Sequence, residues 1–247
     1  MTQSATAAYS VTKPNERIIV ALDVETADEA RNIAAELRGH VGAVKIGLQL
    51  FTAAGPSLVR EFVEAGTNVF LDLKFHDIPN TVATASIEAA RLGVWMFNIH
   101  ASGGSEMMRR TVRAVAESCE IEKIDKPLII GVTVLTSSNK ETMSEIGVGG
   151  ELEAQVVKLV SLASECGLDG VVASPREVAS VRNAVANKDF LTITPGIRSA
   201  LATEDDQKRV TTFRQAMANG SDYVVIGRPI VQAPDRIAAI EQIIAGN

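Results

Sequence analysis

Short apolar segments alternate with amphipathic segments along most of the chain. Eight segments rich in β-branched residues have the length and composition of buried strands, and they read RIIVALD, AVKIGL, NVFLDLK, VWMFNIHA, PLIIGVTVL, GVVAS, FLTITPG and YVVIGRP. The segments between them, such as ADEARNIAAEL, PSLVREFVEAG and TVATASIEAARLG, carry apolar residues at helical spacing. Several of these predicted helices end at a glycine, as at Gly39, Gly66 and Gly167, where glycine commonly closes the last turn.

The strand–helix repeat predicts one α/β domain, a (β/α)8 TIM barrel. Eight repeats within roughly 230 residues match the size of that fold. A doubly wound open sheet is the main alternative, but it usually has fewer strands, and no GxGxxG motif follows the first strand here. We expect the barrel to occupy residues 15–247. Residues 1–14 are mostly small and polar, which predicts a loose N-terminal tail.

The composition of the chain mainly excludes certain partners and locations. The 247 residues are 46% hydrophobic, and the net charge of −6 disfavours nucleic acid as a partner, because that partner requires a basic surface. Neither a signal peptide nor an apolar run of about 18 residues occurs, so no membrane association is expected. Cys119 and Cys166 lack the spacing of metal ligands and are expected to be reduced, buried thiols. These features predict a soluble cytoplasmic protein.

Charged residues interrupt the predicted strands near their C-terminal ends, where barrel enzymes carry their chemistry. Asp23 closes the first strand, and Lys45 lies in the second on the face opposite its apolar residues. In the third strand Asp72 and Lys74 share one face, and apolar side chains occupy the other. We therefore expect these four side chains to point into the barrel. Asp77 follows just past the strand end and is expected to join them in an alternating array of charges.

This array has two interpretations. A buried salt-bridge network that only specifies the fold is one of them, but buried ion pairs contribute weakly to stability. The other is catalysis, since a lysine held between carboxylates stays protonated near neutral pH. Such a lysine can stabilise a developing carbanion and then deliver a proton to it. A Schiff base is disfavoured, because it requires a desolvated lysine with a lowered pKa.

A second candidate site follows the last two strands. ITPGIR ends the seventh strand and VIGRPI ends the eighth, and the loops after these strands frequently bind phosphate in barrels. Gly227 permits close approach of the backbone, and Arg228 offers a forked cationic donor. Residues 197–209 are polar and poor in hydrophobic residues, which is compatible with a closing lid or an ordinary surface loop.

Together these residues resemble a known family. DLKFHDIPNT, combined with Asp23, Lys45, the TPGIR segment and the GRPI ending, is similar to the orotidine 5′-phosphate decarboxylase family from about Arg17 to the C-terminus. The resemblance implies conversion of orotidine 5′-phosphate to uridine 5′-phosphate and carbon dioxide, the last step of de novo pyrimidine nucleotide synthesis. It also implies that no metal and no organic cofactor takes part.

The resemblance further implies roles for individual residues. Lys74 would protonate C6 of the pyrimidine, Asp72 would face the substrate carboxylate, and Lys45 and Asp77 would complete the charge array. The remaining contacts implied with substrate are the ribose hydroxyls for Asp23 and Lys45, the pyrimidine for Thr136, and the phosphate for Arg198, Gln207, Gly227 and Arg228. A homodimer is implied as well, in which Asp77, Ile78 and Thr81 reach into the neighbouring site.

Other interpretations stay open at this point. A magnesium-dependent sugar-phosphate decarboxylase or aldolase on the same barrel would share Asp-x-Lys-x-x-Asp, although Ile-Pro-Asn-Thr fits the nucleotide enzyme. A catalytically silent barrel that binds a phosphorylated metabolite would not need the charge array. His76 is expected to be structural, because alternation turns it away from Lys74. His100 is either a supporting partner of Asp72 or Lys74 or a structural residue, and the three histidines show no zinc-binding spacing.

Overall fold

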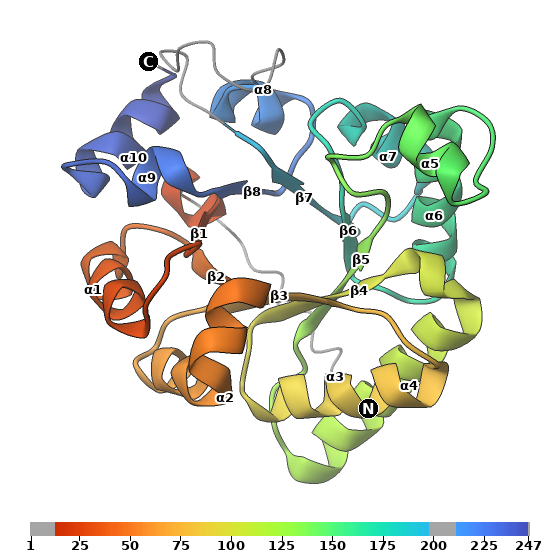
Figure 1. Ribbon diagram of the computed structural model, residues 1–247, viewed down its shortest axis with the longest axis horizontal. Helices are drawn as coiled ribbons and strands as arrows, with labels where there is room; N and C mark the ends of the chain where they lie inside the picture. Colours follow the sequence, from red (N-terminus) through yellow and green to blue (C-terminus); the bar gives the residue numbers. More distant parts are fainter. Residues whose placement is uncertain (1–12, 198–210, 247) are drawn as a thin grey trace.

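The computed structural model describes residues 13–197 and 211–246. Its eight parallel strands form a closed barrel in chain order, which confirms the predicted (β/α)8 TIM barrel (Figure 1). The strands are β1 (Ile18–Ala21), β2 (Ala43–Gly47), β3 (Val69–Phe75), β4 (Met96–His100), β5 (Leu128–Val132), β6 (Gly170–Val172), β7 (Leu191–Pro195) and β8 (Tyr223–Ile226). Because β1 pairs with both β2 and β8, the sheet has no open edge.

Helices surround the barrel as an outer ring (Figure 1). The larger ones are α1 (Ala27–Leu37), α2 (Leu48–Glu64), α3 (Pro79–Arg91), α4 (Gly104–Glu122), α6 (Leu152–Glu165) and α10 (Arg236–Ala245). Shorter segments are η1 (Pro14–Arg17), η2 (Ala101–Gly103), α5 (Lys140–Glu145), α7 (Val178–Ala184), α8 (Phe213–Ala218) and α9 (Arg228–Val231). The Thr26 side chain caps α1 by accepting a hydrogen bond from the Glu29 N–H.

One helix differs from the expectation. The sequence predicts a helix from Pro56, whereas α2 starts eight residues earlier at Leu48 and bends at Gly55. Gly55 has φ of 69° and directly precedes Pro56, which cannot donate a backbone hydrogen bond. The kink therefore divides α2 into an early segment that starts at the end of β2 and the segment predicted from the sequence.

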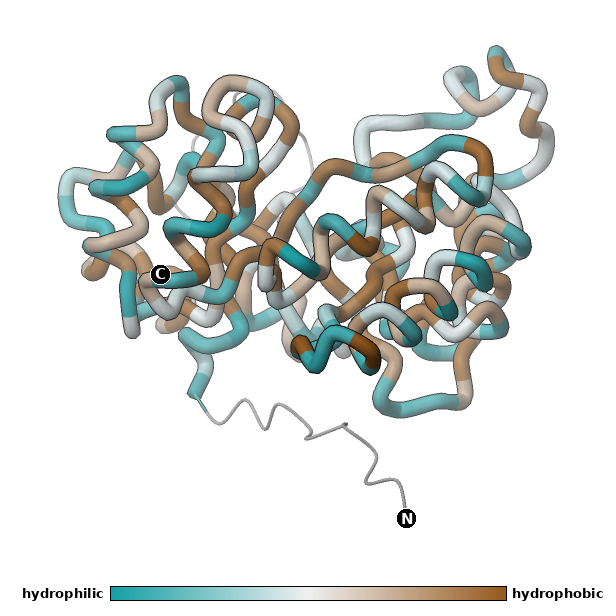
Figure 2. The backbone as a smooth tube through the Cα atoms, turned by 90° about the horizontal axis from the view of Figure 1, so that it is seen from below, coloured by the Kyte–Doolittle hydropathy of each residue, from teal (hydrophilic) through white to brown (hydrophobic). Residues whose placement is uncertain are grey.

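Two hydrophobic layers hold the barrel together. The larger layer packs the outward faces of the strands against the helices, with Val20, Ile46 and Leu71 among its buried members. The smaller layer fills the barrel interior and includes Ile19 and Phe70. Figure 2 shows the same division, with hydrophobic residues along the inner segments and hydrophilic residues along the outer turns. Alternation along each strand thus assigns side chains to one layer or the other, and the charged residues belong to the inward set.

The helices and the cysteines bear on the expectations drawn from composition. Within the described ranges, no helix is both long enough and apolar enough to cross a membrane. Cys119 and Cys166 are buried and carry no disulfide, as expected, and burial raises the pKa of both thiols.

Candidate active site

Three neighbouring strands bring four charged side chains together at the C-terminal end of the barrel. Lys45 in β2 lies at the centre, with its Nζ 3.3 Å from Asp23 Oδ1 and 3.1 Å from Asp72 Oδ2. Lys74 Nζ lies 2.7 Å from the other oxygen of Asp72. The predicted convergence of these residues is therefore confirmed, and the charges alternate in the order Asp23, Lys45, Asp72 and Lys74. We refer to these four residues as the charge array.

Burial differs along the charge array. The side chains of Lys45 and Asp72 are only 11% and 12% exposed, whereas that of Lys74 is 31% exposed and that of Asp23 is 62% exposed. Lys45 and Asp72 are thus largely removed from water. Away from water, charge–charge interactions are stronger. Lys74 keeps access to the cavity above it, as a group that meets a ligand must.

The pKa of Asp72 reflects this environment. Burial is the largest single effect and by itself raises the pKa of the carboxyl group. Lys45 and Lys74, together with hydrogen bonds from Lys74 and Asn98, outweigh burial and hold the pKa of Asp72 below its ordinary value. Asp72 is therefore ionised at neutral pH and keeps a negative charge between the two ammonium groups.

Asn98 in β4 is a member of this site that the sequence interpretation missed. The residue is 1% exposed, its amide nitrogen donates to Asp72 Oδ1 at 2.7 Å, and its amide oxygen accepts from the Lys74 N–H at 2.8 Å. A signal was available in the sequence. Asn98 shares the inward face of its strand with Met96, and a polar residue at such a position requires a partner inside the barrel.

A cavity of about 300 Å³ opens above the charge array. Its charged side is the array with Asn98, and its opposite side is formed mainly by Val132, Val134, Val172, Pro195 and Val225. Thr136 and Gly227, for which the resemblance implies substrate contacts, also line it. One polar side and one apolar side suit a flat, partly polar ligand.

Comparison with known proteins identifies the family. The family model "Orotidine 5′-phosphate decarboxylase / HUMPS family" matches residues 16–243, which is nearly the whole chain. The chain belongs to the orotidine 5′-phosphate decarboxylase family. The resemblance predicted from DLKFHDIPNT is thereby confirmed.

Individual relatives of this family are very similar to the chain. Orotidine 5′-phosphate decarboxylase from Geotalea daltonii is 51% identical over 229 residues, covering 93% of this chain and 95% of the relative. The protein of the same name from Geobacter sulfurreducens gives the same identity and coverage. The crystal structure of orotidine 5′-phosphate decarboxylase from Lactobacillus acidophilus superposes with a TM-score of 0.81 at 35% identity, covering 92% of this chain and 96% of that one.

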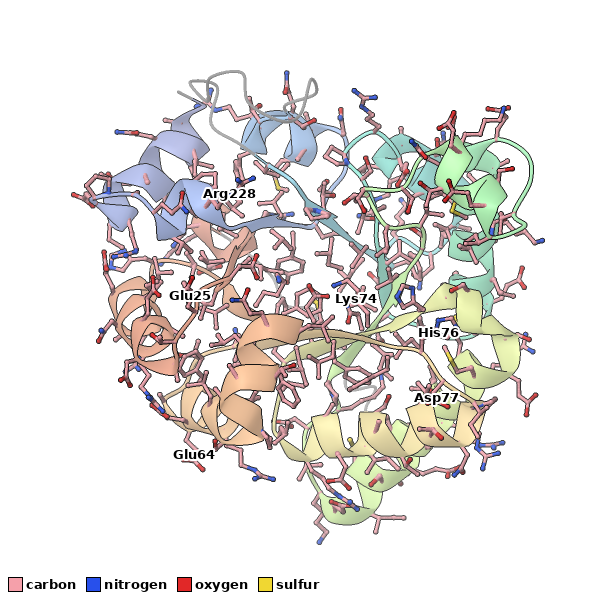
Figure 3. The ribbon with its side chains drawn as sticks, in the orientation of Figure 1. Glu25, Glu64, Lys74, His76, Asp77 and Arg228 are labelled. Carbon is pink, nitrogen blue, oxygen red and sulfur yellow. The ribbon has the colours of Figure 1, made fainter. Side chains whose placement is uncertain are left out.

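Three residues for which the resemblance implies a place at an active site lie away from the charge array of their own chain. Asp77, Ile78 and Thr81 are exposed where the chain leaves β3 and enters α3, and the Asp77 carboxylate accepts a hydrogen bond from the Ile78 N–H at 2.6 Å. Figure 3 shows Lys74 near the middle of the barrel and Asp77 at its outer side. The expectation that Asp77 joins the array within one chain is wrong, because the turn after Phe75 directs it outward.

The expected phosphate site is described in part. Gly227 lines the cavity and precedes α9, whereas the side chain of Arg228 is exposed at the first position of α9 and does not line the cavity (Figure 3). Arg198 and Gln207 lie outside the described residues, as does most of the predicted lid at 197–209.

The rings of the two histidines near Lys74 lie close together at a tilt of 37°. The ring centroids of His76 and His100 are 5.3 Å apart. Burial, then the neighbouring His76 and Lys74, lower the pKa of His100, whereas Asp72 acts in the opposite direction. Among the described hydrogen bonds, none joins His100 to Asp72 or Lys74. Of the two interpretations left open for His100, these contacts favour a structural residue, because Asn98 makes the hydrogen bonds to Asp72 and Lys74.

Proposed function

We infer that this chain converts orotidine 5′-phosphate to uridine 5′-phosphate and carbon dioxide, the last step of de novo UMP synthesis. The enzyme is a carboxy-lyase. Identity of about 50% over 93% of the chain to enzymes named orotidine 5′-phosphate decarboxylase supports the reaction. The ammonium of Lys74, held 2.7 Å from Asp72 at the wall of a cavity, is the observation that supports the mechanism.

The chemical step places unusual demands on the site. When the bond between C6 and the carboxyl carbon breaks, the electron pair stays on C6 in the plane of the ring, where no π system delocalises it. Lys74 opposes that charge with an ammonium fixed in advance, so little reorganisation is needed during reaction. A proton then passes from Lys74 Nζ to C6, carbon dioxide leaves, and water reprotonates the lysine. Asp72 faces the departing carboxylate and holds the Lys74 ammonium in place.

The remaining site residues bind parts of the substrate that do not react. Asp23 and Lys45 bind the ribose hydroxyls, and Thr136 contacts the pyrimidine. Gly227 and Arg228, with Arg198 and Gln207 from outside the described residues, bind the phosphate. Binding energy from such remote groups can hold the ring against the charge array and thus lower the barrier.

A homodimer completes each site in this proposal. Ile78 is 67% exposed although it is a large aliphatic residue, and Asp77 and Thr81 are exposed beside it. In a two-fold interface the same surface patch of both subunits meets, so such a contact would cover Ile78 of both subunits at once. Asp77, Ile78 and Thr81 would then reach the site of the partner subunit. The two unpaired buried thiols support the predicted cytoplasmic location.

A magnesium-dependent sugar-phosphate enzyme is the alternative. The name of the family model joins two kinds of enzyme, so membership of the family does not exclude this alternative. However, the eight relatives compared at 48–51% identity carry the decarboxylase name. Among the residues that the structure describes, no group of three or more carboxylate, histidine or cysteine side chains is arranged to bind a metal ion.

The direct test follows the change in ultraviolet absorbance as orotidylate becomes uridylate. We expect steady turnover by the purified protein, and the same rate after treatment with EDTA. A rate abolished by EDTA and restored by magnesium would favour the alternative. An unchanged spectrum at stoichiometric enzyme would instead identify a catalytically silent binder.

A further inference from the structure

Asn98 makes two hydrogen bonds that both reach β3. The amide nitrogen donates to Asp72 Oδ1 at 2.7 Å, and the amide oxygen accepts from the backbone N–H of Lys74 at 2.8 Å. The side chain is almost completely buried and lies at the cavity wall. One neutral group therefore holds the carboxylate of one array member and the backbone of another.

The backbone around Lys74 explains why such a group is needed. Leu71 pairs with Phe97 and Phe75 pairs with Ile99, so Asp72, Leu73 and Lys74 lie opposite the single residue Asn98. Such a bulge removes regular backbone partners and redirects side chains. Lys74 itself has φ of 53°, in the left-handed region that is unfavourable for a non-glycine residue. The amide oxygen of Asn98 replaces the missing backbone acceptor for the Lys74 N–H.

We propose that Asn98 is a positioning residue that fixes the direction of the Lys74 ammonium and the rotation of the Asp72 carboxylate. This inference rests on the proposed decarboxylation but concerns a residue outside the charge array. Asp72 Oδ1 receives hydrogen bonds from both Lys74 and Asn98, while Oδ2 faces Lys45. Without the amide, the carboxylate could rotate and the strained Lys74 backbone could relax, and both movements would shift Nζ.

Two substitutions separate the two halves of the amide. Asn98→Leu has a similar shape but neither donates nor accepts a hydrogen bond. Asn98→Asp keeps an acceptor for the Lys74 N–H and replaces the donor with an oxygen that can donate only when protonated. Thr192→Val is the matched control, because Thr192 is also a buried polar residue of a barrel strand and its hydroxyl has no partner among the described residues.

For Asn98→Leu we expect kcat to fall by about 10²-fold or more, as displacement of a reacting group by about 1 Å can cause. The dissociation constant of uridine 5′-phosphate should change less than about threefold, because ribose and phosphate contacts hold the product. If Asn98 only stabilised the fold, Asn98→Leu would weaken product binding by a factor similar to the fall in kcat. Thr192→Val should keep both values.

The pH profile of Asn98→Asp gives a second readout. The new carboxyl group would face Asp72 at hydrogen-bond distance, with Lys45 from β2, Lys74 from β3 and His100 from β4 as the other ionisable neighbours. Two adjacent carboxylates share a proton, so the pKa of the new group is raised. The ratio of variant to wild-type kcat should therefore increase as pH decreases, because the protonated form restores the donor.

The results separate failure of this inference from failure of the proposed function. If the wild-type protein decarboxylates orotidylate while folded Asn98→Leu keeps kcat within threefold, the inference is wrong and the function stands. A variant-to-wild-type ratio that does not vary with pH would also overturn it. If the wild-type protein does not turn over, the proposed function fails, and a ¹³C NMR titration of Asp72 in wild type and Asn98→Leu still tests the hydrogen bond. The pKa of Asp72 should rise in the variant, and an unchanged pKa would count against the inference.

Discussion

Asp72 is the residue on which the charge array depends. Its two oxygens form ion pairs with different lysines, with distances of 3.1 Å to Lys45 Nζ and 2.7 Å to Lys74 Nζ. Loss of one partner from a buried ion pair is costly, because it leaves an uncompensated charge away from water. The arrangement therefore keeps both ammonium groups in place before any substrate binds, which reduces reorganisation during the reaction.

Lys74→Ala tests the residue assigned to proton transfer. We expect kcat to fall by about 10³-fold or more, since one group supplies both the fixed charge and the proton. Binding of uridine 5′-phosphate, measured by calorimetry, should be largely kept. Lys158→Ala, at an exposed position of α6, is the control and should leave kcat unchanged. Comparable turnover in Lys74→Ala would remove Lys74 from its assigned role.

His100 gives a prediction for stability against pH. Burial, His76 and Lys74 place its pKa in the folded protein below the ordinary histidine value of 6.5. The unfolded chain therefore binds more protons as pH falls below about 6.5, and the free energy of unfolding must decrease there. Urea denaturation at several pH values should show a smaller acid-side decrease for His100→Asn than for wild type.

The matched control for this measurement is His40→Asn, at an exposed position outside the strands. It should keep the wild-type dependence on pH. Equal slopes for His100→Asn and wild type between pH 7 and pH 5 would show that protonation of His100 is not linked to unfolding.

Adjacent strands constrain one another most clearly where β6 meets β7. A Cβ atom added at Gly170 would lie 2.4 Å from the carbonyl oxygen of Leu191 and 2.7 Å from its Cβ atom. A backbone atom cannot move aside without shifting its strand. The residue type at this position is therefore determined by the neighbouring strand and not by local strand propensity.

Gly170→Ala should lower the free energy of unfolding by about 1–3 kcal/mol, the usual cost of forcing an extra group into a packed interior. Chemical denaturation measures this directly. Gly149→Ala is the control, because an added Cβ atom there meets nothing within 4 Å. An equal effect of the two substitutions would mean that the barrel adjusts its strands without strain.

At the scale of the whole molecule, barrel closure and self-association have different consequences. Closure joins β1 to β8 and thereby brings Gly227 beside Asp23, with an added Cβ at Gly227 lying 3.8 Å from Asp23 Oδ2. The ends of the sequence thus complete one cavity within a single chain. Asp77 and Ile78 point outward, and in the proposed dimer they would complete the cavity of the partner subunit.

Mixing two inactive variants tests the proposed dimer. Lys74→Ala and Asp77→Ala should each have little activity alone, but in a mixed dimer one site keeps both Lys74 and the partner-derived Asp77. After unfolding and refolding together at equal amounts, we expect about a quarter of the wild-type activity, because half of the dimers are mixed and half of their sites are intact. No regained activity in verified mixed dimers would place Asp77 in its own subunit's site.

Ile78→Asp provides a physical measurement of the same interface. A buried charge at the interface should shift the protein toward monomers in sedimentation velocity. Ile121→Asp is the control, because Ile121 is also a large exposed aliphatic residue, at 79% exposure, but lies on α4. Dissociation by both substitutions, or by neither, would contradict an interface centred on Ile78.

The sequence by itself determined the barrel, the strand order and the inward direction of Lys45, Asp72 and Lys74. It could do so because side-chain direction along a strand follows a period of two residues, which is a local property. The DLKFHDIPNT motif likewise determined the family, which the comparisons confirm.

Only the tertiary structure decided the hydrogen bonds of Asn98, the positive φ of Lys74 and the outward direction of Asp77. Each depends on how a neighbouring element is aligned. The register between β3 and β4 shifts between Leu71 and Phe75, and no periodicity within either strand reports such a shift. Asp77 lies in a turn, where side-chain direction follows the path of the chain into α3 and strand alternation no longer applies. Contacts between elements, unlike alternation within them, require the folded chain.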